Sequence, residues 1–163
     1  MRKTIGILLP LALVLAACEP DTGCRESMEV GMGVSVVRQL VDSVSTQRVN
    51  QWDSVFVQGV GTDSILYTHS QSANKKTLTM PLRSADTITI YQMQWHGMWD
   101  TLYIKHTPVE HFVSMACGCA IYHTIDTVWA NNTFIQEIEI IHSAVERGET
   151  ENIRLTLVPE PKP

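Results

Sequence analysis

The residues best suited to chemistry lie in or beside one stretch, FVSMACGCAIYH, at residues 112–123. Imidazole and thiolate ligands for zinc or copper(I) could come from His111, Cys117, Cys119 and His123. All four stand at odd positions, so one straight strand would place them on a single face. That strand would also hold His111 and Cys117 about 20 Å apart, so the ligands converge only if the chain turns back at Gly118 or if Cys24 and a distant histidine join. The spacing does not match the paired motifs of zinc sites.

The same cysteines could form a redox couple or a structural bridge. Cys-Gly-Cys is not the Cys-x-x-Cys motif of thiol oxidoreductases, and its apolar neighbours do not favour a thiolate. In a strand, the Cα atoms of Cys117 and Cys119 are about 6.6 Å apart with parallel Cβ vectors, which opposes a bridge between them. A disulfide from Cys24 is less demanding and is worth about 4–5 kcal/mol through chain entropy. Either Cys117 or Cys119 could be its partner.

The N-terminus predicts where the chain goes. Arg2 and Lys3 precede an uncharged apolar run, residues 5–17, which is shorter than the roughly 20 residues of a membrane span and typical of a secretory signal. The run ends in Leu-Ala-Ala-Cys at residues 15–18, which resembles the lipobox of bacterial lipoproteins. The resemblance implies cleavage before Cys18 and acylation of Cys18, so that the mature protein is held on a membrane by its N-terminal lipid.

The charge balance argues against nucleic acid as a partner. Without Arg2 and Lys3, 10 of the 12 basic side chains remain against 17 acidic ones, and no basic patch is present. The exported chain would reach the bacterial cell envelope, where disulfides persist. Acidic residues after the lipid cysteine, Glu19 and Asp21, bear on sorting between membranes. We expect the outer membrane rather than the inner one, and the leaflet is left open.

Five stretches alternate apolar and polar residues with the period of two that is typical of strands: residues 53–60, 86–95, 100–106, 132–142 and 152–158. Residues 34–45 have valines at helical spacing, but their β-branched content favours a strand. Turn residues separate the stretches, among them Gly61, Pro108 and Gly148. Eight or nine strands predict an all-β fold with one antiparallel β-sandwich, immunoglobulin-like or transthyretin-like.

The expected organisation is a signal peptide at residues 1–17, a short tether at 18–27, the sandwich at 28–158 and a Pro-rich tail at 159–163. The tail should end the last strand, because its prolines cannot donate to a ladder. Residues 132–142 should contain a bulge, since no single register buries all of their apolar side chains.

A resemblance to a known family covers residues 24–158. It rests on the lipobox, on Cys24 beyond it, and on three segments: LTMPLR at 78–83, DTLYIKHTPVEHFVSMACGC at 100–119 and NIRLTL at 152–157. Together these resemble a family of small uncharacterised lipoproteins from Bacteroidota, which has no assigned activity. That family has one cysteine before the glycine. The resemblance therefore implies a Cys24–Cys117 bridge, with Cys119 as an addition of this chain.

The chain also resembles the O-glycosylation motif of the same bacterial group, which is Asp, then Ser or Thr, then an aliphatic residue. Six of the seven aspartates begin such a triplet, so glycans are a hypothesis for Ser43, Ser54, Ser64, Thr87, Thr101 and Thr127. The triplets also have a purely structural interpretation. Asp and Ser or Thr make local turns, after which an aliphatic residue enters the core.

The remaining polar residues suggest no catalytic constellation. The other histidines are scattered and are expected at the surface or in turns: His69, His96, His106 and His142. Trp95 and Trp99 flank a predicted hairpin tip, where they pack on the sandwich or contact a glycan or a protein.

We therefore expect a non-enzymatic envelope lipoprotein without a cofactor. Its disulfide-pinned sandwich would bind other envelope proteins or glycans, or would have a structural role. The alternative is a periplasmic metal-binding or thiol factor that uses Cys117, Cys119 and nearby histidines.

Overall fold

The computed structural model describes residues 24, 29–41, 46–62, 64–148 and 150–161, which form an all-β fold. Within these residues, no helix is both long enough and apolar enough to cross a membrane. The only helix in the described ranges is the single turn α2 (His69–Ser72). Their twelve strands are β1 (Met32–Val41), β2 (Thr46–Val49), β3 (Val55–Gly59), β4 (Ile65–Tyr67), β5 (Thr77–Met80), β6 (Ile88–Trp95), β7 (Met98–Ser114), β8 (Gly118–Ala130), β9 (Ile135–Ile140), β10 (Ala144–Val145), β11 (Glu151–Leu157) and β12 (Glu160–Pro161).

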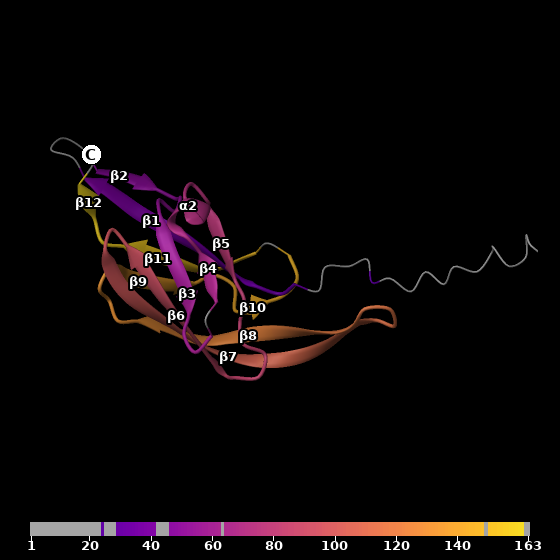
Figure 1. The fold of residues 1–163 in the computed structure, drawn as a ribbon. Helices are drawn as coiled ribbons and strands as arrows, with labels where there is room; N and C mark the ends of the chain where they lie inside the picture. Colours follow the sequence, from indigo (N-terminus) through magenta and orange to yellow (C-terminus); the bar gives the residue numbers. More distant parts are fainter. Residues whose placement is uncertain (1–23, 25–28, 42–45, 63, 149, 162–163) are drawn as a thin grey trace, which may run out of the picture.

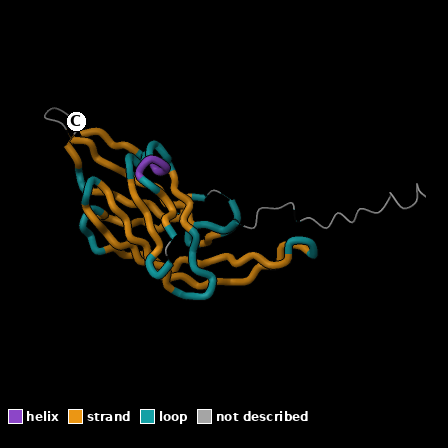
Figure 2. The backbone as a smooth tube through the Cα atoms, viewed as in Figure 1, coloured by secondary structure: helices purple, strands orange, loops and turns teal. Residues whose placement is uncertain are grey.

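The strands form two curled sheets (Figures 1 and 2). The first sheet has the order β12-β1-β11-β9, and β2 and β5 also pair with β1. The second sheet has the order β10-β8-β7-β6-β3-β4. The prediction counted fewer strands because β2, β4, β10 and β12 are too short to show an alternating pattern.

One hydrophobic core receives side chains from both sheets, which makes the fold sandwich-like. On β6, Tyr91, Met93 and Trp95 are buried while the residues between them face outward. The first sheet contributes the buried residues Met32, Val34, Val36, Leu78, Met80, Ile153, Leu155 and Leu157. Period-two alternation predicts the buried face of β11 correctly, but at the start of β6 the apolar Ile88 is exposed and the polar Thr89 is buried.

The first sheet is mixed, so the prediction of a purely antiparallel sandwich is wrong for it. β1 pairs in parallel with β11, from Val34 opposite Ile153 to Val37 opposite Thr156, and also in parallel with β12. Alternation reports the face of a side chain and is the same for both strand directions. The direction of a pair between the two ends of the chain cannot be derived from it.

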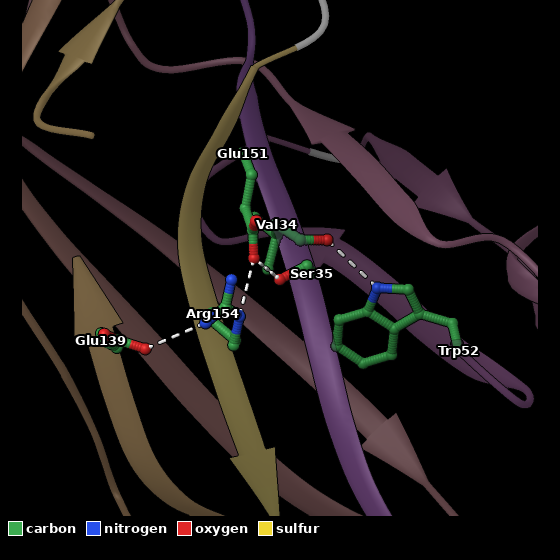
Figure 3. A network of polar contacts seen from close by, with 6 residues as sticks. All are labelled: Val34, Ser35, Trp52, Glu139, Glu151 and Arg154. Atoms are coloured by element: carbon green, nitrogen blue, oxygen red, sulfur yellow. Dashed lines mark hydrogen bonds and ion pairs between the residues drawn. The ribbon is translucent and has the colours of Figure 1, made fainter. Parts of the chain in front are cut away.

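Polar side chains reinforce the β1–β11 pair on its outer face (Figure 3). Ser35 of β1 donates a hydrogen bond to the carboxylate of Glu151, which also accepts one from Arg154 Nε at 2.8 Å. The hydrogen bond from Arg154 lowers the pKa of Glu151. Arg154 reaches across to Glu139 of β9 at 3.2 Å, so one guanidinium links two strands. On β1, the carbonyl of Val34 accepts a hydrogen bond from the Trp52 indole.

Pro108 was expected in a turn, and this prediction is wrong: it lies inside the 17-residue strand β7, opposite His123 of β8. The pairing of β6 with β7 ends at Lys105. Beyond that residue no strand of the described chain pairs with this edge of β7, and a proline is tolerated at such an edge.

The bulge predicted in residues 132–142 is confirmed. The register of β9 against β11 shifts between Thr156 and Leu157, so that Ile135 and Ile138 pair on opposite sides of the irregularity. β11 ends at Leu157, as the prolines predict, but Glu160 and Pro161 then form β12 beside β1.

The carboxylate of Asp100 organises the crossing from β8 to β9. Asp100 is only 2% exposed, and it lies at the start of β7 beside the loop that leaves the second sheet for the first. Its two oxygens accept hydrogen bonds of 2.8–3.1 Å from the backbone N–H groups of Thr101, Asn131, Thr133, Phe134 and Ile135. A buried carboxylate is stable only when it is satisfied in this way.

Replacing Asp100 by Asn should therefore lower the free energy of unfolding by roughly 3 kcal/mol. The amide removes the negative charge, and its NH2 group, which is a donor, then faces backbone N–H groups that need an acceptor. Chemical denaturation measures this change. The control Asp126→Asn, at an exposed aspartate of β8, should cost under about 0.5 kcal/mol. Equal effects of the two variants would contradict the role given to Asp100.

Candidate functional site

The outer half of the β7–β8 hairpin projects from the body of the molecule (Figures 1 and 2). We call residues 109–122 the arm. Below it, β10 still pairs with His123 and Thr124, whereas within the arm only the two hairpin strands pair with each other. The chain reverses at residues 115–117, and Gly118 has a φ of +75°, a conformation that glycine adopts without strain. The arm is the most protruding feature of the described chain.

A disulfide joins the tip of the arm to the N-terminal region. Cys117, in the turn, is bonded to Cys24 with a Cα–Cα distance of 4.6 Å and a sequence separation of 93. This is the pairing that the family resemblance favours. Ser114 Oγ accepts a hydrogen bond from the Cys117 backbone N–H at 3.1 Å and fixes the turn beside the bridge.

Cys119 is a free, exposed thiol on β8 opposite Phe112. The four residues considered as metal ligands are not brought together. His111 pairs with Ala120 and stacks on the Tyr122 ring at 4.6 Å, on the face of the hairpin away from Cys119 and His123. Among the described residues, no group of three or more His, Cys, Asp and Glu side chains could hold a metal ion.

The shared face of the odd positions required one straight strand, and the chain instead turns back at Gly118 between two strands. Position 111 of β7 lies opposite position 120 of β8, so odd residues of one strand share a face with even residues of the other. The bridge also takes one of the two sulfurs that the metal interpretation required.

A buried pair of histidines lies at the base of the arm. His106 is fully buried, which contradicts its expected surface position, and His123 is 4% exposed. Their Nδ1 atoms are 3.1 Å apart, and His106 Nε2 lies 2.8 Å from Thr89 Oγ1. The Thr89 hydroxyl oxygen accepts a hydrogen bond from the Arg83 backbone N–H. We therefore assign the Thr89 hydroxyl as the donor to His106 Nε2, and the protonated His106 Nδ1 as the donor to His123 Nδ1.

This pair was missed because its members are 17 residues apart and look isolated in the sequence. One signal was available. His106 continues the inward series of Leu102 and Ile104 on the same strand, and a residue in that series is expected in the core. Burial lowers the pKa of both imidazoles, and the nearby His106 lowers that of His123 further, to about 4.

The aromatic residues near the β6–β7 turn have separate roles. His96 and Gly97 form the predicted tip, both with positive φ. Trp95 is buried and packs on Phe134, whereas Trp99 is 48% exposed with its edge on Phe56. Only Trp99 is therefore available to a partner.

The Asp-Ser/Thr triplets differ in accessibility. Ser64, Thr87 and Thr127 are exposed, and Ser54 and Thr101 are half-buried. Ser43 lies outside the described residues, as does Cys18.

A hollow beside β5 has a volume of about 680 Å³ and is open to solvent. It is lined by Glu29, Val30, Gly31, Tyr67, Thr79, Pro81 and Gly148. The Tyr67 hydroxyl is hydrogen-bonded to the backbone of Thr79, and Glu29 is the only carboxylate among the lining residues. The lining residues do not include a nucleophile next to a base.

The histidine pair should make stability depend on pH. Both side chains are neutral in the folded protein, but they take up protons near pH 6.5 when unfolded, so the free energy of unfolding should fall as pH decreases from 7 toward 5. The variant His123→Gln should flatten this dependence in chemical denaturation, and His69→Gln, at an exposed site, should not. An unchanged slope in His123→Gln would contradict the assignment.

The bridge should stabilise the fold. Cys24→Ser should lower the free energy of unfolding by roughly 4 kcal/mol, because the unfolded chain loses a cross-link across a long loop. The matched control is Cys119→Ser, which removes the free thiol and should change little. Denaturation curves of the two variants under non-reducing conditions measure this difference in the free energy of unfolding. Equal stability of both variants would count against the bridge.

Comparison with known proteins gives one match, to a family that is described as a family of unknown function, DUF6452. Its model matches residues 54–157, which include both strands of the arm and Cys117. No curated protein and no solved structure matches the chain. Because the matched residues are well over half of the sequence, the chain belongs to the DUF6452 family.

Proposed function

We propose that this chain is a bacterial cell-envelope lipoprotein, anchored by lipid on Cys18, whose two-sheet body binds other envelope components and catalyses no reaction. The observation that carries the proposal is the Cys24–Cys117 bridge. It connects the lipobox end of the chain to the tip of the arm. A structural disulfide also suits an exported protein, because thiols stay reduced in the cytosol.

The bridge limits how far the body can move from an anchored Cys18. Cys24 is six positions after Cys18, and a chain of this length spans at most about 20 Å. Without the bridge, the first constraint would be β1, which begins at Met32, and the tether could extend to about 45–50 Å. The bridged protein therefore stays close to its membrane, with the tip of the arm on the membrane side.

A short tether favours partners that lie in or near the same membrane. The outer face of the second sheet offers exposed aromatic surface for such contacts. Trp129 is 40% exposed and stacks on Tyr103, and Trp99 is exposed on the same sheet. Envelope proteins and glycans are both suited to aromatic side chains with polar tips. We place the protein on the outer membrane rather than the inner one.

Glycans on the body form a second part of the proposal. The exposed hydroxyls of Ser64, Thr87 and Thr127 are the best acceptors among the described triplets. Thr101 is a poor one, because the carboxylate of the preceding Asp100 is buried and fully used by backbone N–H groups.

Mass spectrometry of the mature protein from its native envelope tests the anchor. The N-terminal peptide should begin at Cys18 and carry the mass of acyl chains, and hexose should appear on the peptides with exposed triplets. The variant Cys18→Ala should lose the acyl chains and leave the membrane fraction, whereas Cys119→Ala should remain there. An unmodified N-terminal peptide that starts elsewhere would refute the proposal.

A further inference from the structure

The tip of the arm exposes large apolar side chains. Phe112 is 59% exposed and Met115 is 94% exposed. Both lie within four positions of each other at the turn of a protruding hairpin, and exposed apolar side chains gathered in this way mark an interaction site.

The hairpin itself carries no charged side chain near its turn, because residues 112–121 contain no Asp, Glu, Lys or Arg. Glu110 lies further from the turn, as does the Tyr122 hydroxyl that accepts a hydrogen bond from Arg147 at 3.0 Å. Arg25 and Glu26 follow the bridged Cys24 in the sequence, so the apolar contact is assigned to the side chains of Phe112 and Met115 alone.

The backbone at the tip is largely satisfied within the hairpin. Phe112 pairs with Cys119 and Ser114 with Gly118, and the Cys117 N–H is bonded to Ser114 Oγ. An irregular chain is excluded from a hydrocarbon layer because its backbone N–H and C=O groups would have no hydrogen-bond partner there. A paired hairpin turn with apolar side chains can enter the outer part of such a layer, where hydrated headgroups serve its outer edges.

The bridge determines which surface the tip meets. Cys24 holds the turn of the arm within about 20 Å of the residue that carries the lipid in our proposed function. The length of chain between Cys18 and the arm is thus too short to place the tip anywhere but beside the anchoring membrane. This geometry identifies the occupant as lipid rather than as a distant protein.

From these observations we propose that the arm is a second membrane contact, in which Phe112 and Met115 insert into the lipid layer that holds Cys18. The inference rests on the proposed function, since it requires the anchored chain. It assigns to the arm the task of fixing the orientation of the body relative to the membrane.

The free thiol of Cys119 provides the probe, because it lies opposite Phe112 and is exposed. Mature lipidated protein with a nitroxide on Cys119 is reconstituted in vesicles of phosphatidylethanolamine and phosphatidylglycerol. The label should be reached several-fold more readily by lipid-soluble oxygen than by a water-soluble nickel complex. The control is Cys119→Ser with Gln92→Cys, labelled on the exposed face of β6, where nickel access should dominate.

The double variant Phe112→Ser and Met115→Gln should return the Cys119 label to water while the protein still floats with vesicles through its lipid. The matched variant Ile65→Ser, at an apolar residue of the body that is 55% exposed, should leave the label in lipid. Retention of the Cys24–Cys117 bridge in intact mass confirms that each variant has folded.

The outcomes separate the two proposals. A protein that floats with vesicles but keeps its Cys119 label in water would overturn the membrane contact and leave the anchor intact. A label that is protected in native envelopes but not in pure lipid vesicles would also overturn it, because the occupant would then be a protein. Failure of the mature protein to float at all would instead refute the proposed function.

Discussion

The fold depends on one buried carboxylate. Asp100 begins β7 in the second sheet, and its oxygens hold the backbone of the loop through which the chain passes to β9 in the first sheet. Five backbone N–H groups donate to this single side chain, and those of Phe134 and Ile135 are buried. The relative position of the two sheets, and with it the shared core of Trp95 and Phe134, follows from this crossing. Because the arm is the continuation of β7, its direction is fixed by the same strand.

The sequence predicted the parts of the fold that depend on local pattern. The alternation in residues 86–95 and 152–158 identified β6 and β11, and for β11 it also identified the buried face. The bulge in β9 followed from a mismatch of that pattern. Predictions failed where the answer depends on a distant strand. The parallel direction of β1 and β11 and the tolerance of Pro108 both require knowledge of which edge is covered, and a single sequence does not contain it.

The candidate site was predicted in composition but not in arrangement. The stretch around Cys117 and Cys119 is indeed the tip of the arm, and Gly118 is indeed where the chain turns back. The turn separates the odd positions of its two strands, so the residues that looked like one metal site lie on different faces. His106 found a partner in His123 for the same reason: hairpin register, rather than spacing along one strand, decides which side chains meet. Family membership adds no activity to this picture, and the Cys24–Cys117 bridge carries the functional proposal.

The parallel pairing of β1 with β11 has a consequence for the order of folding. One edge of β1 cannot form its backbone hydrogen bonds with β11 until the residues of β11, more than a hundred positions later, are present. A chain that is made from its N-terminus would therefore hold β1 half-paired, through β2 and β5, until β11 is present. Contacts of such long sequence separation slow folding and leave an edge open to other strands in the meantime. Protection of the open edge of β1 during folding is thus a requirement that the topology itself creates.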